Sequence, residues 1–237
     1  DDARVAADAG APSGHVVVAD AQTRGRGSHG RSWSSPAGTD LYLSIVERTQ
    51  LPPRSIPVLT LAVGLGVARA VEALAPGSDV RVKWPNDVWL DGKKCAGILV
   101  ESSSTGARID AFVVGIGLGV NRTEWPPELA RGATSLRVAR AAASGRAPDA
   151  EPELDRAAVL AHLLLEVEAA VDTLATRGPA PIVEAVGARL ALVGASVRVG
   201  TEAGTLLDEE AHRGFHERWP EDADSTEDQK QPRMQSR

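Results

Sequence analysis

The sequence has little of several features that mark secreted, membrane or nucleic-acid-binding proteins. It contains one cysteine in 237 residues, so it forms no internal disulfide, which fits a reducing compartment. No apolar run approaches the ~20 residues that span a bilayer, and no signal peptide is visible. Its formal net charge is -6 rather than positive, which argues against a general nucleic-acid binder. We therefore expect a cytoplasmic protein without membrane contact.

What the sequence does have is enough hydrophobic residues, 43%, for one sizeable core with a small appendage. Helical spacing of apolar residues predicts helices, and short apolar or alternating runs predict strands. The expected helices cover 1–9, 56–75, 154–176 and 182–190. The expected strands cover 15–19, 41–46, 80–84, 88–90, 93–101, 109–116 and 195–199. Turns or irregular loops are expected over 102–106, 121–131 and 139–152.

Two local signals predict how the middle strands connect. Asp91-Gly92 is a strong type I′ hairpin signal, so the strand at 93–101 is expected to return beside the strand at 88–90. Pro85 cannot donate to a strand ladder, so it marks a bend before the strand at 88–90. We therefore expect polar side chains around this bend and hairpin to lie near one another.

A glycine- and arginine-rich loop, residues 22–33, follows the first expected strand. It contains Gly25, Gly27 and Gly30 together with Arg24, Arg26 and Arg31. Glycine lets backbone come close to a ligand, and successive backbone N–H groups form an anion-binding concavity. Arginine adds paired donors for phosphate or carboxylate oxygens. The loop is therefore either a cationic cover for an anionic ligand or a solvated linker, and composition alone favours the linker.

Several further runs accompany this loop in a fixed order. Ser-Pro-x-Gly stands at 35–38, Lys-Trp-Pro-Asn-Asp at 83–87, and Lys-x-x-Gly-Ile-Leu-x-Glu at 94–101. Gly-Leu-Gly-Val-Asn follows at 117–121, and Ala-Thr-Ser-Leu at 133–136. Together with the glycine loop, this series strongly resembles the catalytic domain of biotin protein ligases. The likeness runs from about Val16 to Val199.

The resemblance implies a mixed α/β fold of the class II aminoacyl-tRNA synthetase and biotin synthetase type. Such a fold has a mixed β-sheet with packed helices and a small C-terminal SH3-like β-barrel. By this resemblance the catalytic domain would cover 1–190, and 191–208 would be a remnant of the C-terminal β domain. Residues 209–237 are acidic, polar and poor in apolar residues, so we expect a disordered tail there.

The resemblance also implies a reaction and the residues that perform it. The chain would use ATP to convert biotin to biotinyl-5'-AMP and would transfer biotin to a lysine of a biotin carboxyl carrier protein. The implied catalytic residues are Lys94, Arg26 and Lys83. The implied biotin-binding residues are Gln22, Gly25, Arg26, Tyr42, Lys94, Gly97 and Gly117. The implied ATP or adenylate residues are Gly25, Arg26, Gly27, Arg31, Trp33 and Asn121, and Asp87 would orient the Mg²⁺ that accompanies ATP.

Plainer interpretations exist for several of these residues. Lys94 is also one of a pair of hairpin lysines that would ordinarily be solvated, and Asp87 is also a bend-capping residue. A tryptophan beside a loop, such as Trp33, is as often part of the core as a ligand platform. Cys95 is expected to be an inert, buried strand residue. No histidine has ligand spacing, so no structural metal is expected.

The chain departs from the family pattern in three places. Ser28 stands where many members carry another arginine, and the Ser-Thr-Asn segment of the family would end just where this chain begins, at Asp1. The C-terminal barrel begins at 197–199 and 204–208 and then gives way to a charged tail. Because the chain starts with Asp1 rather than Met, we expect a piece of a longer protein.

Two other functions stay open beside the ligase. One is a lipoate or octanoate transferase of the same superfamily, which the runs at 83–87 and 94–101 disfavour. The other is a non-catalytic biotin-binding remnant or assembly partner, because both ends depart from the family pattern. The expected partner is the biotin carboxyl carrier domain of a biotin-dependent carboxylase, with a homodimer possible. No DNA partner is expected, because no helix-turn-helix head is visible.

Overall fold

The computed structural model describes residues 1–48, 56–105, 108–194, 196–199 and 202–205. The chain divides into two compact units, Asp1–Arg189 and Leu190–Arg237. In the second unit β7 (Ser196–Val199) pairs antiparallel with β8 (Glu202–Thr205). The predicted tail at 209–237 lies outside the described residues.

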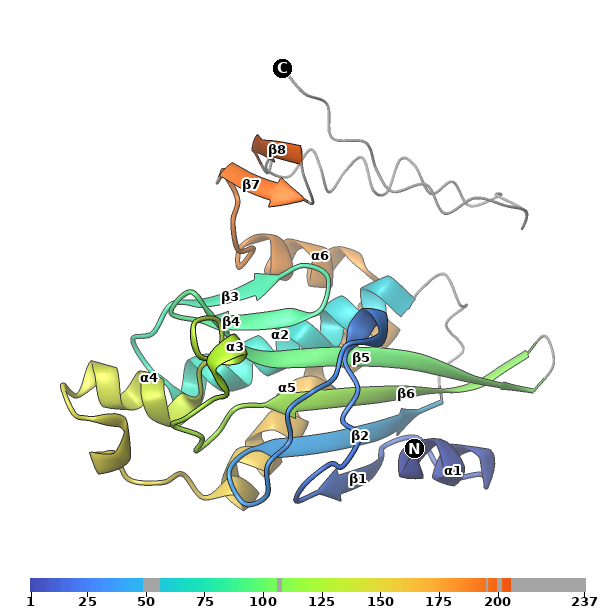
Figure 1. The fold of residues 1–237 in the computed structure, drawn as a ribbon. Helices are drawn as coiled ribbons and strands as arrows, with labels where there is room; N and C mark the ends of the chain where they lie inside the picture. Colours follow the sequence, from blue (N-terminus) through green and yellow to red (C-terminus); the bar gives the residue numbers. More distant parts are fainter. Residues whose placement is uncertain (49–55, 106–107, 195, 200–201, 206–237) are drawn as a thin grey trace. The chain divides into compact units, whose positions relative to one another are not determined.

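The first unit is organised around a six-stranded sheet in the order β1-β2-β6-β5-β4-β3 (Figure 1). Its strands are β1 (His15–Ala19), β2 (Leu41–Glu47), β3 (Val80–Lys83), β4 (Asp87–Leu90), β5 (Lys93–Thr105) and β6 (Arg108–Leu118). All pairings between these strands are antiparallel, so the expected mixed sheet is instead an antiparallel one. The reason is local: β3, β4 and β5 follow one another through short turns, β6 follows β5 in the chain, and no crossover helix separates these strands. The type I′ hairpin is confirmed, with φ of 51° at Asp91 and 77° at Gly92.

Helices cover both faces of the sheet. The helices in the described residues are α1 (Asp2–Asp8), α2 (Ile56–Leu74), α3 (Pro127–Ala130), α4 (Leu136–Ala143), α5 (Arg156–Arg177) and α6 (Ala180–Gly187), with short 3₁₀ turns η1 (Ser28–Gly30) and η3 (Pro148–Ala150); α1 and α2 lie on the sheet directly. The helix α2 packs against β3, β4 and β5, and α5 packs on α2. The short helix α1 contacts β1, β2, β5 and β6.

Three predicted segments differ from the structure. The expected turn at 102–106 is wrong, because β5 continues to Thr105 and pairs with β6 through a register shift at Ser103 and Ser104. The expected loop at 139–152 is wrong in its first half, where α4 begins after Ser135. The Ser135 hydroxyl accepts a hydrogen bond from the Val138 N–H at 3.2 Å, and the alanines that follow favour a helix. The irregular segment at 121–131 also contains the single turn α3.

One described helix is long and apolar enough to span a membrane by length and composition alone. It is the stretch Pro57–Leu74 of α2, with a mean hydropathy of 1.6. The sequence-based statement that no apolar run approaches this length is therefore corrected. Because 61% of this stretch is buried inside the protein against the sheet and α5, it has the character of a core helix.

The strand register decides which side chains share a face of the sheet. Residues that lie directly opposite in an antiparallel pair point to the same face. Ile98 pairs with Ile116, and the Ile98 side chain reaches α2 at Gly64, so this face is the α2 face. The alternate residues, Gly97 opposite Gly117 and Leu99 opposite Gly115, point to the other face. We call this second face the glycine face.

Candidate active site

The glycine face is hollow where its middle strands carry glycine. Gly97, Gly115 and Gly117 come from β5 and β6, and Ser44 of β2 lies opposite Gly115. Further along the same face the residues are larger, and α1 covers them: Ala3 and Ala7 pack with Val46, Ala111 and Val113. The hollow therefore begins where the aliphatic cover ends.

The Trp33 ring lies directly over the glycine floor. A Cβ atom on Gly97 would lie 2.8 Å from ring atom Cζ3, and one on Gly117 would lie 2.6 Å from Cζ2 and Nε1. A side chain at either position would therefore collide with the ring. The cavity that remains has a volume of about 110 Å³, whereas pockets that hold small-molecule ligands typically measure about 300–1,000 Å³. In this structure Trp33 fills much of the hollow.

The loop that carries Trp33 folds back on itself over the hollow. The Gly27 N–H donates to the Arg31 carbonyl at 2.7 Å, and the Trp33 N–H donates to the Gly25 carbonyl at 2.8 Å. Gly25 has no room for a side chain, because a Cβ there would lie 2.8 Å from both Gln22 Oε1 and Ser35 Oγ. The loop is thus a small ordered hairpin, and the solvated-linker interpretation does not describe it.

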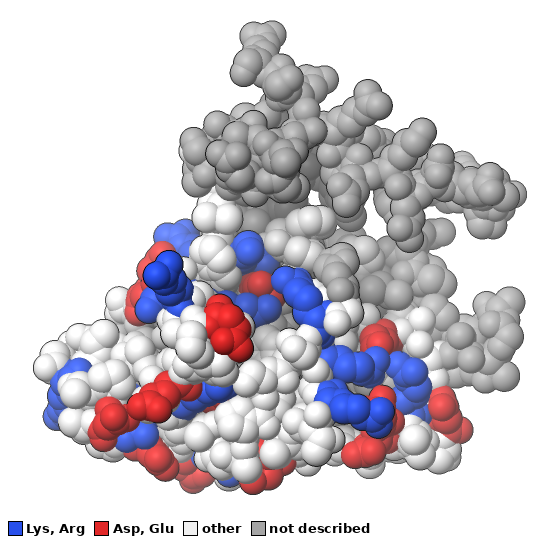
Figure 2. Space-filling model, in the orientation of Figure 1, with Lys and Arg blue, Asp and Glu red and all other residues white. Residues whose placement is uncertain are grey.

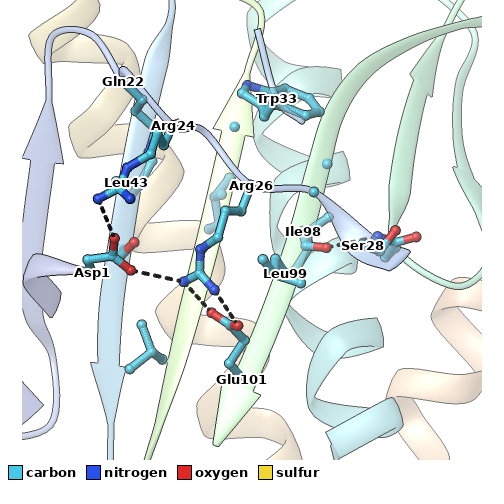
Figure 3. Close-up of a pocket in the computed structure, with 18 of the residues that line it drawn as sticks. Asp1, Gln22, Arg24, Arg26, Ser28, Trp33, Leu43, Ile98, Leu99 and Glu101 are labelled. Carbon is cyan, nitrogen blue, oxygen red and sulfur yellow. Dashed lines mark hydrogen bonds and ion pairs between the residues drawn. The ribbon is translucent and has the colours of Figure 1, made fainter. Parts of the chain in front are cut away.

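Two cations with carboxylate partners lie at opposite ends of the hollow. Near Trp33, Lys94 Nζ lies 2.6 Å from Asp87 Oδ1 and 5.1 Å from the centre of the Trp33 ring. At the other end the Arg26 guanidinium donates two hydrogen bonds, each 2.7 Å, to the two oxygens of Glu101 (Figure 3). Arg4 lies 3.3 Å from Glu101, and Asp1 lies 3.7 Å from Arg26.

About half of the predicted site residues border the hollow. Those that line it are Gln22, Arg26, Gly27, Trp33, Lys94, Gly97 and Gly117. Those that do not line it are Gly25, Arg31, Tyr42, Lys83, Asp87 and Asn121. Of the second group, Gly25, Arg31 and Asp87 contact the lining directly, through Trp33, Ser28 and Lys94 respectively.

Three of these predicted residues have their side chains engaged with other parts of the protein. Asn121 is 5% exposed, and its amide exchanges two hydrogen bonds, of 2.9 and 2.8 Å, with the Leu154 backbone. Arg31 turns back to donate to Ser28 Oγ at 2.8 Å. Lys83 Nζ lies 5.0 Å over the Trp89 ring. Their expected ligand contacts therefore stay predictions, and Asn121 would first have to leave a buried position.

A buried carboxyl supports the edge of the site. Asp40 accepts a hydrogen bond from the Val120 N–H at 2.9 Å, and the Tyr42 hydroxyl donates to it at 3.3 Å. Burial raises the pKa of Asp40, although the Val120 N–H and the charge of Arg122 oppose the shift. Burial, with the nearby Asp40 charge, also raises the pKa of Tyr42. Tyr42 is thus a buried donor whose single hydroxyl proton is shared between the Asp40 carboxyl and the Pro36 carbonyl oxygen, which lies 3.0 Å from the hydroxyl oxygen.

Burial keeps Cys95 protonated and confirms that it is a buried strand residue. It is 2% exposed, and burial raises its pKa, so the thiol is not a nucleophile at neutral pH. Among the described residues, no group of three or more His, Cys, Asp or Glu side chains could hold a metal. Asp87 offers a carboxylate beside Lys94.

The sequence reasoning missed Glu101, Arg4 and Asp1, all of which line the hollow. For Glu101 a signal was present, because it ends the run at 94–101 and shares the alternation of Gly97 and Leu99 on one strand face. Arg4 and Asp1 carry no such pattern. They reach the hollow only because α1 packs beside it.

Surface charge on this side of the molecule is mixed. Figure 2 shows basic side chains in separate groups with acidic side chains next to them, rather than in one continuous basic patch. The same mixing recurs in the hollow, where Arg4, Arg24, Arg26 and Lys94 line the walls together with Asp1 and Glu101. The lining has an excess of positive charge, which suits an anionic ligand.

Comparison with known proteins identifies relatives for this arrangement. The profile of the Biotin/lipoate A/B protein ligase family matches residues 8–121. The Bifunctional ligase/repressor BirA of Bacillus spizizenii is 37% identical over 198 residues, which cover 83% of this chain and 58% of the relative. The chain thus spans less than two thirds of that relative's length.

Two further proteins align with most of this chain and over most of their own length. The Biotin--[acetyl-CoA-carboxylase] ligase of Paracoccus denitrificans is 37% identical over 188 residues, which cover 78% of this chain and 75% of the relative. The structure of biotin protein ligase from Aquifex aeolicus in complex with biotin and ATP has a TM-score of 0.68 and 29% identity, covering 85% of this chain and 80% of that one. The expected α/β fold class is confirmed by this likeness, and the chain belongs to the biotin/lipoate A/B protein ligase family.

Proposed function

We propose that the chain is the catalytic part of an ATP-dependent biotin protein ligase. It would convert biotin and ATP to biotinyl-5'-AMP and pyrophosphate, and would then transfer the biotinyl group to a lysine of a biotin carboxyl carrier domain. The relatives whose names include biotin ligase activity support this reaction class. The observation that carries the proposal is the hollow itself, a glycine floor with a cation at each end under an arginine-bearing loop.

The first step needs positive charge more than it needs a nucleophile from the protein. An oxygen of the biotin carboxylate attacks the α-phosphorus of ATP, and the bond to the leaving pyrophosphate breaks. Two anions must come together for this, so preorganised cations lower the barrier. Lys94 is suited to lie between the two groups, because its ammonium is fixed beside the floor by the 2.6 Å contact with Asp87.

The floor and the loop would supply binding and orientation. Glycines in β5 and β6 leave backbone N–H and C=O groups close to a flat ring such as the ureido ring of biotin. Trp33 now covers that floor, so biotin would displace its ring, and the ring would then be free to pack against the adenylate. Gly25, Arg26 and Gly27 would close over the carboxylate and phosphates.

The second step needs only access for the carrier. The carrier lysine attacks the carbonyl carbon of the mixed anhydride, AMP leaves with the bonding electrons, and an amide forms. The amine proton passes to solvent. Magnesium would arrive with ATP, held mainly by phosphate oxygens and water, since Mg²⁺ uses few protein ligands in such sites. Asp87 could supply one carboxylate oxygen to it.

The test measures pyrophosphate release by the purified chain with ATP and either biotin or lipoate. The ligase proposal predicts release with biotin alone, followed by addition of biotin to one lysine of a carrier domain in intact-mass spectra. Equal release with lipoate would support the lipoate transferase alternative. Biotin binding without any release would instead identify a non-catalytic remnant.

A further inference from the structure

The ion pair between Arg26 and Glu101 has a consequence for ligand binding. Both terminal nitrogens of Arg26 donate a hydrogen bond of 2.7 Å, one to each oxygen of the Glu101 carboxylate. A ligand carboxylate or phosphate would use the same two donors in the same paired geometry. Glu101 therefore occupies the donors that an anionic ligand would need.

The position of this pair along the floor makes the conflict spatial as well. Lys94 Nζ lies 3.3 Å from where a Gly97 Cβ would be, so its ammonium stands over Gly97. Glu101 is four residues further along β5, a separation of about 13 Å between the two Cα atoms. Figure 3 shows the Arg26 side chain directed toward Glu101 and away from Trp33. While it is paired with Glu101, Arg26 is therefore directed toward the far end of the floor from Lys94.

A second cation makes the exchange feasible. Arg4 lies 3.3 Å from Glu101, so the carboxylate keeps a partner after Arg26 leaves. The Glu101 side chain is also 29% exposed, which lets water replace the lost hydrogen bonds. Lys94 differs, since its partner Asp87 is only 13% exposed. The Arg26 pair is thus the more readily released of the two.

We propose that Glu101 is a positioning residue that acts as a releasable counter-ion for Arg26. It holds the arginine and its loop at the far end of the hollow until an anionic group of the ligand takes its place. Ligand affinity is then lowered by the competition. This inference rests on the proposed function, because it takes biotin as the anionic ligand.

The test is the affinity of biotin for Glu101→Gln, measured by titration calorimetry. The substitution keeps the shape of the side chain and removes its charge. Because exposed ion pairs are worth little, we expect biotin to bind roughly two- to fivefold more tightly. Glu168→Gln on α5 is the matched control. Glu168 is exposed, and neutralising it changes the net charge by the same amount as Glu101→Gln. The biotin affinity of Glu168→Gln should therefore equal that of the wild type.

A purely structural role for Glu101 predicts the opposite sign. If Glu101 only fastened the loop, Glu101→Gln would loosen the loop and weaken biotin binding. Glu101→Asp keeps the charge on a shorter side chain, so its affinity should fall between those of the wild type and Glu101→Gln. It also tests the inference if Glu101→Gln does not fold. In an Arg26→Ala background, Glu101→Gln should change the affinity no further, because the competition acts through Arg26.

The outcomes separate the inference from the proposed function. Wild-type protein that binds no biotin would contradict the proposed function, and the inference with it. Wild-type binding with unchanged or weaker binding by Glu101→Gln would overturn the inference alone. Tighter binding that persists in the Arg26→Ala background would also overturn it, since the effect would then come from net charge.

Discussion

The two faces of the central sheet are made by the same strands but filled in opposite ways. On the α2 face, Ile98 and Ile116 are buried against a helix. On the glycine face the alternate positions, Gly97 and Gly117, carry no side chain, and a loop tryptophan lies over them. The α2 face maximises apolar burial. The glycine face gives up that burial to keep space beside charged groups, which is the expected cost of a binding site.

Removing a charged group from the glycine face should have the largest effect on activity. Lys94→Ala removes the ammonium that would be shared by carboxylate and α-phosphate. Loss of one preorganised electrostatic contact typically lowers the rate by ~10²–10³, so biotin-dependent pyrophosphate release should fall by about that factor. Lys93→Ala is the control, because Lys93 is the exposed neighbour and should keep wild-type activity. Near wild-type release by Lys94→Ala would refute its assignment.

Matched glycine substitutions on the two faces should separate packing from binding. A Cβ on Gly66 of α2 would lie 2.6 Å from the Val167 Cα and 2.7 Å from the Glu166 carbonyl oxygen, which are backbone atoms of α5. Gly66→Val should therefore lower the free energy of unfolding by about 1–3 kcal/mol. In Gly117→Val the new side chain meets the Trp33 side chain rather than backbone, so the substitution should lower the free energy of unfolding by less than about 1 kcal/mol.

Thermal and urea denaturation of the two valine variants provide the measurement. Gly66→Val should have the lower midpoint of the two, because its Cβ meets backbone atoms of α5. Equal midpoints would mean that Trp33 is packed on the glycine face as firmly as α5 is packed on α2. In that event the hollow would be an ordinary part of the core.

The smallest expected effect concerns Asp40, at the edge of the glycine face. Its pKa is raised by burial, so the folded state favours the protonated carboxyl more than the unfolded chain does. Its contribution to stability is therefore complete below the ordinary pKa of 3.8 and is lost as pH rises through the folded-state value. Asp40→Asn still accepts from the Val120 N–H without the charge. The free energy of unfolding of Asp40→Asn relative to wild type should therefore rise with pH over this window. A difference between the two proteins that does not change with pH would contradict the raised pKa of Asp40.

The sequence predicted the α2 face better than the glycine face, for a physical reason. Hydrophobic periodicity reflects burial, so it predicted α2 and all six strands of the main sheet to within a few residues at their ends. The exception is the end of β5, which was expected to turn at 102–106 but continues to Thr105. The Asp91-Gly92 turn was equally readable, because it needs positive φ at both residues. The helix α4 was missed because the Gly and Pro content of 139–152 indicated a loop over the whole stretch, and the cap at Ser135 was not recognised.

On the glycine face the sequence indicated which residues gather but not what they contact. The motif order placed Arg26, Lys94 and Trp33 in one site, and all three line the hollow. It did not reveal that Glu101 holds Arg26 or that Asn121 is committed to Leu154. These contacts join residues that are 75 and 33 positions apart in the chain. Periodicity describes local spacing, so it gives no information about which distant residues pair.

The most direct test of the account is the biotin affinity of the two valine variants, measured where both are folded. If the glycine floor exists to admit a ligand, Gly117→Val should abolish measurable biotin binding, whereas Gly66→Val should bind as tightly as wild type. The opposite pattern, with biotin binding intact in Gly117→Val, would contradict the claim that the hollow over β5 and β6 is the ligand site.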